Sequence, residues 1–210
     1  MCGIVAVANF DRVAVSRRRL AAMRDILHHR GPDDEGLYVD GPVGLGHRRL
    51  SIIDVSDAGR QPMANEDGSV LVIFNGEIYN YLELGEALKT KGHRFSSTSD
   101  TEVILHQYEE DDDNCVNRFN GMFSFVLWDR RRRRLLAARD RMGIKQLYYY
   151  LSPTKLILAS EIKAILMDPD VQRGVDPKAL ADYYFCGRAL GDKTMFRGIR
   201  ELEPGHRLSV

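Results

Sequence analysis

Cysteine is scarce in this chain of 210 residues, which contains only three, at positions 2, 115 and 186. They are far apart, and neither a Cys-x-x-Cys pair nor a mixed cysteine and histidine spacing occurs. Such a set argues against a disulfide framework and against a structural zinc site. We therefore expect no metal site, and reduced thiols typical of a cytoplasmic protein.

Net charge and long apolar runs are also missing. Thirty basic and thirty acidic side chains cancel, so no overall field favours nucleic acid or an anionic membrane as a partner. The apolar start, residues 1–8, has no basic flank and is soon interrupted by Asn9 and Asp11, which is too short for a membrane span and unlike a signal peptide. No repeat or low-complexity linker divides the chain, and we predict one domain over residues 1–210.

Short apolar runs separated by glycine, aspartate and proline predict many strands. The expected strands cover residues 3–9, 36–39, 43–50, 70–74, 122–128, 135–139, 146–151 and 155–159. Amphipathic helices are expected from a cap at Ser16 to about Arg30, and over residues 81–91, 101–110, 161–167 and 177–184. Many strands with a few helices favour an α+β domain whose sheets pack face to face beneath outer helices.

The amino terminus carries the sharpest chemical signal. Removal of Met1, which is usual before a small residue, leaves Cys2 with both a thiol and a free α-amine. An unperturbed α-amine has a pKa of about 7.7–8.0, so near neutral pH a fraction of it is uncharged and can accept the thiol proton. Cys2 would then be a nucleophile that carries its own general base, with Gly3 keeping the approach open. The alternative is a small buried cysteine without chemistry.

Three further segments offer groups that suit a small zwitterionic substrate. Arg49, at a strand end, presents a guanidinium that can fork onto a carboxylate. Asn75 and Gly76, expected in a loop after the strand 70–74, present an amide donor and an accessible backbone N–H for an oxyanion. Asp100, near a helix start, can hold an ammonium group. Each segment has the alternative interpretation of a turn, a helix cap or a surface ion pair.

A set of motifs runs in order along nearly the whole chain. The motifs are Met-Cys-Gly-Ile-Val at 1–5, His-Arg-Gly-Pro-Asp at 29–33, Arg-Leu-Ser-Ile-Ile-Asp at 49–54, Gln-Pro-Met at 61–63, Phe-Asn-Gly-Glu-Ile-Tyr-Asn at 74–80, Ser-Asp-Thr-Glu at 99–102, Asn-Gly-Met-Phe-Ser-Phe at 120–125, Arg-Asp-Arg-Met-Gly-Ile-Lys at 139–145 and Ala-Ser-Glu-Ile-Lys-Ala at 159–164. Together they resemble the glutaminase domain of glutamine-hydrolysing asparagine synthetases, which are class II glutamine amidotransferases.

The resemblance implies a four-layer αββα sandwich of the N-terminal-nucleophile hydrolase type, with two antiparallel sheets. It implies that Cys2 forms a γ-glutamyl thioester and releases ammonia, after which water frees glutamate. The other roles that it implies are an oxyanion hole from Asn75 and the Gly76 N–H, a carboxylate clamp from Arg49, amine binding by Asp100 with the Gly76–Glu77 backbone, and a pocket shaped by Leu50, Ile52 and Ile53. The motif at 29–33 is expected to support this site.

The partners that the resemblance implies are L-glutamine and an ATP-dependent synthetase domain, in the same chain or another. That domain would use the ammonia to amidate a carboxylate, with aspartate to asparagine as the first choice. ATP and magnesium would belong there, with no cofactor in this domain, and a homodimer is allowed. The Ser-Gly-Gly loop of such a domain is absent before Val210, so we expect a piece cut at the domain boundary or a stand-alone glutaminase. Residues 183–185 are interpreted as covering an interface to it.

Several points stay open or depart from the family. Gln146 stands where the family usually has proline, in a segment that is structural there. Related enzymes amidate other carboxylates, including sugar acids of surface polysaccharides, and a non-catalytic regulatory domain could keep the fold. A peptide-bond hydrolase would need a pocket without the Arg49 and Asp100 pair.

We interpret residues 130–134, five arginines, as a solvated hairpin turn rather than a nucleic-acid patch, and residues 115 and 186 as packing cysteines.

Overall fold

The computed structural model describes residues 1–210, and its strands form two antiparallel sheets. The first sheet contains β1 (Gly3–Asn9), β2 (Asp34–Asp40), β3 (Val43–Arg49), β8 (Tyr148–Leu151), β9 (Lys155–Ala159) and β10 (Ile199–Glu201). The second contains β4 (Met63–Ala64), β5 (Val70–Ile78), β6 (Gly121–Asp129), β7 (Arg134–Arg139) and β11 (Arg207–Ser209). The strand orders are β10-β8-β9-β1-β3-β2 and β11-β7-β6-β5-β4.

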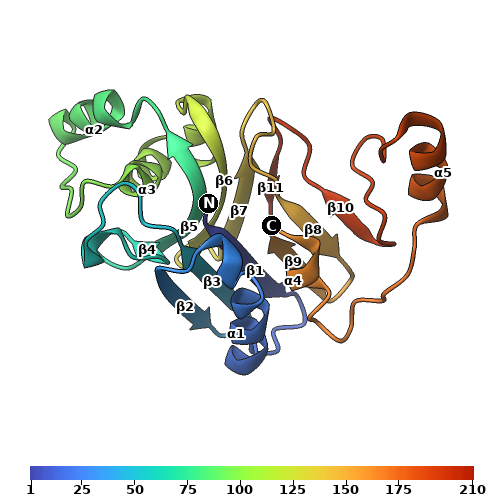
Figure 1. Cartoon of the computed structure of the whole chain (residues 1–210). Helices are drawn as coiled ribbons and strands as arrows, with labels where there is room; N and C mark the ends of the chain where they lie inside the picture. The colour runs from blue at the N-terminus through green and yellow to red at the C-terminus, as the bar shows by residue number, and fades with distance from the viewer.

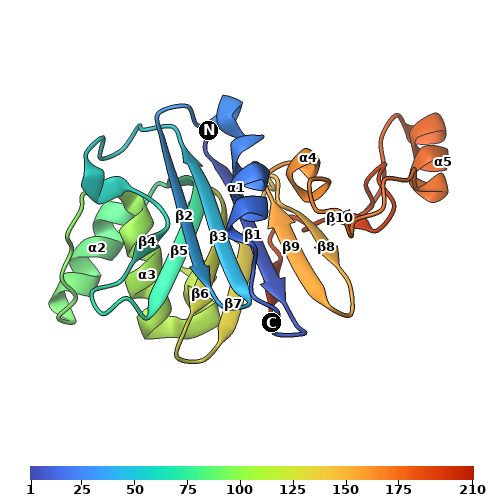
Figure 2. The same ribbon diagram turned by 90° about the horizontal axis from the view of Figure 1, so that it is seen from below.

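Helices cover the outer face of each sheet (Figures 1 and 2). On the first sheet lie α1 (Arg17–Asp25), against β1 and β3, and α4 (Ile162–Ile165), against β8 and β9. On the second lies α3 (Asp100–Asp111), against β5, with α2 (Tyr81–Thr90) packed on α3. A fifth helix, α5 (Pro177–Cys186), stands apart from these layers at one end of the molecule in both views. The order helix, sheet, sheet, helix is the predicted four-layer sandwich.

Three apolar layers fill the spaces between these four. Along β1, Ile4 and Ala6 face the second sheet, whereas Val5 and Val7 face α1 and α4. The strand β5 alternates in the same way between the space that separates the sheets and the space beneath α3. Because both faces of these central strands are buried, their sequences are continuous apolar runs rather than polar and apolar alternations.

Most of the predicted elements are confirmed, with β1 and β9 matching from end to end and α2 and α3 within one residue at each end. The strands β4, β10 and β11 were not predicted, because two or three residues show no period. None of the helices has the length and apolar character that crossing a membrane would need.

The predicted helix from Ser16 to about Arg30 is too long. Ser16 does cap α1, but the α-helix ends at Asp25 and a 3₁₀ turn, η1 (His28–Arg30), follows. The Arg30 N–H donates to Leu27 O at 2.9 Å, a three-residue spacing. This tighter path brings Gly31 against the β3 backbone, where an added Cβ would lie 2.3 Å from the carbonyl carbon of Arg48. The turn therefore fixes the position of the residues that follow α1.

The interpretations of the five arginines and of the cysteines at 115 and 186 have different outcomes. The turn between β6 and β7 covers residues 130–133, close to the prediction, and Arg134 is the first residue of β7. Four of the five arginines pair with carboxylates of Asp40, Asp67, Asp112 and Asp113, so neighbouring acids already neutralise these four. Cys115 is fully buried, as predicted. The prediction for Cys186 is wrong: it ends α5, whose residues are largely exposed, and is itself exposed.

Candidate active site

Strand alternation brings the predicted residues together at one end of the sandwich. Cys2 precedes β1 on the side of Ile4 and Ala6, which face the second sheet. Gly3 pairs with Arg48, so Arg49 is the β3 residue beside Cys2. On the opposite sheet Asn75 continues the face of Leu71 and Ile73. The Cys2 thiol, the Arg49 guanidinium and the Asn75 amide therefore come from two different sheets and lie together at one end of the space between them.

A cavity of about 160 Å³ lies at this point. Its lining includes all nine residues that the sequence predicted for catalysis or substrate binding: Cys2, Arg49, Leu50, Ile52, Ile53, Asn75, Gly76, Glu77 and Asp100. They come from the residue before β1, from β3 and the loop after it, from β5, and from the start of α3. The structure thus assembles into one pocket residues that span half the chain.

Cys2 is partly buried and is held by the residue that follows β3 and by the 3₁₀ turn η1. The Leu50 N–H donates to Cys2 Sγ at 3.4 Å, and Arg30 Nε donates to the Cys2 carbonyl at 2.9 Å. Arg30 is in turn held by Glu161 at 3.0 Å, so η1 supports the nucleophile candidate without lining the cavity. Burial raises the pKa of the Cys2 thiol, against the smaller opposing effect of the Leu50 backbone and the nearby cations of Arg49 and Arg30. The thiol needs a base.

Asn75 and Gly76 lie inside β5, so their predicted place in a loop is wrong. The Asn75 side chain is 1% exposed, yet neither its Nδ2 nor its Oδ1 has a hydrogen-bond partner. Such groups are costly to bury unpaired, by about 1–3 kcal/mol each, and usually have a function. An added Cβ on Gly76 would lie 2.2 Å from Met122 O, so glycine is required here by the packing of β5 on β6.

The direction of the Gly76 N–H follows from the strand register. Even-numbered N–H groups at this end of β5 point away from β6: that of Phe74 donates to Gln61 Oε1 at 2.7 Å, and that of Ile78 to Asp100 Oδ2 at 2.9 Å. The N–H of Gly76 lies between them and points to the same open edge. A donor from the backbone therefore accompanies the Asn75 amide at the cavity.

Asp100 begins α3 behind the cap Ser99, as predicted, and is 4% exposed. Burial, together with the nearby charge of Glu77, raises the pKa of its carboxyl to about 6, although the Ile78 N–H stabilises the carboxylate and opposes the shift. No cation pairs with it among the ion pairs of the structure. A buried carboxylate without a counter-ion is suited to a ligand that brings a positive charge.

Arg49 holds the loop that closes the cavity. Its guanidinium donates to Ser56 O at 3.0 Å and to Asp54 O, which leaves other N–H groups of its five for a ligand. The same loop is fixed from the 29–33 motif, since Ser51 N donates to Asp33 Oδ2 at 2.8 Å. The loop carries Leu50, Ile52 and Ile53, of which Ile52 is 72% exposed.

Comparison with known proteins decides the family. A family described as glutamine amidotransferase domain matches residues 1–210. The chain belongs to this family. It is 40% identical over 213 residues to asparagine synthetase [glutamine-hydrolyzing] 3 of Bacillus subtilis (strain 168), covering 100% of this chain and 34% of that protein. It is 41% identical to asparagine synthetase [glutamine-hydrolyzing] 2 of the same organism, covering 100% of this chain and 29% of that protein. The amidotransferase domain thus spans about a third of the length of these curated relatives.

Solved structures agree on the fold of this glutamine amidotransferase domain. The glutamine phosphoribosylpyrophosphate amidotransferase from B. subtilis, complexed with ADP and GMP, superposes with a TM-score of 0.68 at 20% identity, covering 84% of this chain and 46% of that one. The shared architecture is the αββα sandwich of N-terminal-nucleophile hydrolases, with the two antiparallel sheets in its centre. The predicted fold class is confirmed.

The lining residues of the amidotransferase pocket that were not predicted include Gln61 and Lys145. Gln61 accepts from Phe74 N and donates to Thr101 Oγ1 at 3.1 Å, so it ties β5 to α3. Lys145 lines the cavity, is 6% exposed, and lies close enough to Cys2 for their charges to interact. Burial lowers the pKa of Lys145, and Arg30 lowers it further. Both residues lie in the quoted motifs, which was the available signal, but only the tertiary fold brings them to the pocket.

Proposed function

We propose that this domain hydrolyses L-glutamine to glutamate and ammonia through a thioester on Cys2. The observation that carries the proposal is the buried, unpartnered amide of Asn75 in the same small cavity as the Cys2 thiol. A cavity that holds a nucleophile, two spare hydrogen-bond donors, a guanidinium and an unpaired carboxylate fits the amide, the carboxylate and the ammonium of glutamine.

The reaction begins once Met1 is removed, which turns the Cys2 nitrogen into a free amine. Burial lowers the pKa of the terminal amine at Met1, and Arg30 and Lys145 lower it further. An amine on Cys2 would occupy the same positive surroundings, and in its neutral form it takes the thiol proton. The sulfur then bonds to the side-chain amide carbon of glutamine, and the oxyanion accepts hydrogen bonds from Asn75 Nδ2 and the Gly76 N–H.

The two halves of the reaction use the same proton carrier. The protonated amine gives its proton to the leaving nitrogen, the carbon–nitrogen bond breaks, and ammonia departs. Water then loses a proton to the amine and attacks the thioester carbon, the carbon–sulfur bond breaks, and the thiol is restored with release of glutamate. No step requires a metal or an organic cofactor, and we propose that this domain uses none.

The substrate is held by its two charged ends in this proposal. Arg49 binds the α-carboxylate with the N–H groups that the loop leaves free. Asp100 binds the α-ammonium, assisted by the Gly76–Glu77 backbone, and Leu50, Ile52 and Ile53 wall the aliphatic part. The pairing of a cation and an anion across the pocket favours a free amino acid over a peptide, which disfavours a peptide-bond hydrolase.

We further propose that the ammonia passes to an ATP-dependent synthetase domain that amidates aspartate. Relatives about three times as long as this chain, named glutamine-hydrolysing asparagine synthetases, support this partner. The exposed aromatic side chains of α5, Tyr183, Tyr184 and Phe185, offer a surface for it. ATP and magnesium would be bound in that domain. A cytoplasmic location fits the free cysteines, and association with a second copy is compatible with this arrangement.

The hydrolytic part is tested with the parent and Cys2→Ala. Intact mass shows whether Met1 is absent, and glutamate release is measured with glutamine as the only substrate. We expect a processed parent to release glutamate and the variant to release none. Retention of Met1 in an active protein, or glutamate release that survives Cys2→Ala, would overturn the proposal. The acceptor is tested separately, with ATP and either aspartate or sugar acids, in the protein that carries the synthetase domain.

A further inference from the structure

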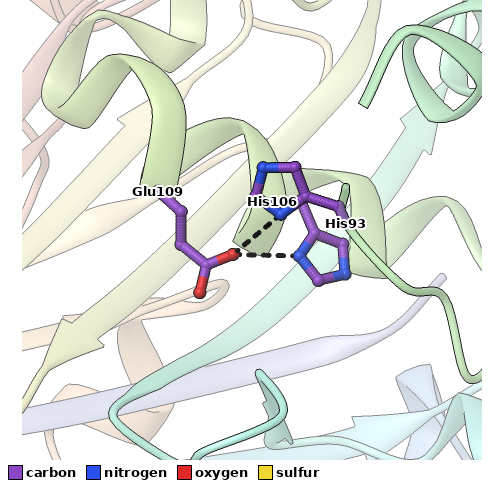
Figure 3. Close-up of side chains that lie close together, drawn as sticks. All are labelled: His93, His106 and Glu109. Carbon is purple, nitrogen blue, oxygen red and sulfur yellow. Dashed lines mark hydrogen bonds and ion pairs between the residues drawn. The ribbon is translucent and has the colours of Figure 1, made fainter. Parts of the chain in front are cut away.

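Two histidines and a glutamate meet beside α3, and none of them lines the cavity of Cys2 (Figure 3). A single oxygen of Glu109, Oε2, lies 2.9 Å from Nδ1 of His106 and 3.4 Å from Nδ1 of His93. The three atoms all lie within 4.8 Å of one another. Figure 3 shows both rings directed at that oxygen from different parts of the chain.

The three side chains reach this point because α3 and the segment before it fold together. His106 and Glu109 are three residues apart on α3 and so share one face of the helix. His93 comes from the connection that follows α2. The His106 side chain is 1% exposed, whereas that of Glu109 is 25% exposed. The cluster therefore has a rigid, buried inner side and an outer side that solvent reaches.

Two of the three atoms that point away from the cluster are hydrogen-bonded to a carboxylate or an amide. His93 Nε2 lies 3.0 Å from Glu110 Oε1, and Asn65 Nδ2 donates to Glu109 Oε1 at 2.6 Å. His106 Nε2 has no hydrogen-bond partner, and its nearest carboxylate oxygen is that of Glu102 at 3.8 Å. The His93 arrangement is characteristic of metal-binding histidines, whose second nitrogen bonds to a carboxylate that orients the ring.

The surroundings are rich in negative charge. Glu102, Glu109 and Glu110 surround the two rings. The neighbouring basic side chain is Lys91, which pairs with Glu110. The cluster thus attracts a positive charge, whether a proton or a metal ion.

We propose that His93, His106 and Glu109 form a binding site for a divalent transition-metal ion of the zinc type, through the two Nδ1 atoms and Oε2. Zinc bonds to histidine nitrogen and carboxylate oxygen measure about 2.0–2.2 Å, which sets neighbouring ligands of a tetrahedral site about 3.3 Å apart. The two separations to Glu109 Oε2, 2.9 and 3.4 Å, are close to that value. Two imidazoles with one carboxylate suit zinc, cobalt or nickel better than magnesium or calcium.

The ion would be structural, because it joins the segment between α2 and α3 to the helix. That segment is already tied to α3 through Ser96 and Ser97, which donate to Glu102, and to the pocket loop through Thr98 N, which donates to Asp54 Oδ2 at 2.8 Å. The proposal departs from the sequence analysis, which predicted no metal site. His93 is remote from the other two ligands in sequence, so no short motif marks the set.

The test is a cobalt(II) titration of the 210-residue chain with Cys2 and Cys186 changed to serine, because a terminal cysteine and an exposed thiol bind metals themselves. We expect one ion per chain, with visible d–d absorption and no thiolate charge-transfer band, and a rise in Tm with added zinc. His93→Ala and Glu109→Gln each remove a direct ligand, so each should weaken binding by at least the roughly 10–100-fold that follows loss of an outer-shell partner. His206→Ala, at an exposed histidine elsewhere, is the matched control and should bind as the parent does.

Two ligand variants, His93→Ala and Glu109→Gln, are compared so that a loss of binding can be told from a loss of the fold. Glu109→Gln preserves the size of the side chain and its contact with Asn65. Circular dichroism of each variant shows whether the fold persists. Failure of the parent to bind cobalt would overturn the proposal, and so would equal affinity in the parent and in a folded His93→Ala. In either case the cluster is an ion pair between protonated histidine and Glu109.

Discussion

We expect the buried carboxylate of Asp100 to lower the stability of the folded domain at neutral pH, although the proposed function needs this carboxylate to bind the substrate ammonium. Its carboxyl pKa rises from an ordinary 3.8 to about 6 in the folded chain, chiefly because the group is buried. The carboxylate is therefore harder to form in the folded state than in the unfolded one. The folded state favours the protonated carboxyl. The stability that this preference contributes is fully present below about pH 4 and is lost as the pH rises through about 6. About 2 pKa units correspond to roughly 3 kcal/mol at neutral pH.

Asp100→Asn should remove this cost. Asparagine keeps the size of the side chain and an oxygen that can accept the Ile78 N–H, but it carries no charge. At pH 7.5 we expect unfolding to cost up to about 3 kcal/mol more than in the parent, which raises Tm by about 6–12 °C for a chain of this length. At pH 4 the two proteins should unfold at nearly the same temperature. The variant should bind glutamine poorly, because an amide cannot neutralise the α-ammonium.

Calorimetric unfolding from pH 4 to pH 8 measures the effect directly. Glu83→Gln is the matched control, since it removes one negative charge from an exposed position on α2, and it should change stability by no more than about 0.5 kcal/mol at any pH. A non-reactive glutamine analogue should raise Tm in the parent much more than in Asp100→Asn. Equal stability at pH 7.5, or a difference that does not shrink on acidification, would refute the reasoning.

Three other substitutions test separate parts of the pocket. Asn75→Ala should lower kcat about 10²–10³-fold, the usual loss for one oxyanion donor, and an unchanged kcat in steady-state glutaminase assays would rule out that role. Arg49→Ala should mainly raise KM for glutamine, whereas a loss confined to kcat would contradict the carboxylate clamp. Lys145→Met removes a cation near Cys2, so alkylation of the thiol by iodoacetamide at pH 7 should slow. A rate equal to that of the parent would show that Lys145 does not favour the thiolate.

The candidate site was predictable where a residue's chemistry stands out against its neighbours. Cys2 precedes an apolar strand, Arg49 ends one, and Asp100 follows a capping serine. Local patterns are sufficient to mark such positions. Asn75 lines the pocket but was expected in a loop, because Asn and Gly usually end strands. Here β5 continues to Ile78, and its pairing with β6 outweighs that tendency.

The rest of the site depends on contacts between segments that are distant in sequence. Gln61 faces the pocket only because its amide bridges β5 and α3, and Lys145 only because the connection between β7 and β8 passes near Cys2 in space. His93 meets His106 and Glu109 only when the segment after α2 folds back on α3. Hydrophobic periodicity describes one helix or strand at a time. It therefore predicts which face of that element a residue occupies, but not which residues of other elements contact it.

Three groups that are unfavourable in the empty domain lie together in one pocket, and this arrangement relates stability to function. The Asn75 amide has no partner, the Asp100 carboxylate has no counter-ion, and the Cys2 thiol is difficult to ionise. Each is unfavourable in the empty pocket, and the surrounding sheets hold each of them in place. Bound glutamine would supply the missing cation to Asp100 at once. The Asn75 amide gains its partner only as the oxyanion forms, so that part of the interaction energy lowers the reaction barrier and does not tighten substrate binding.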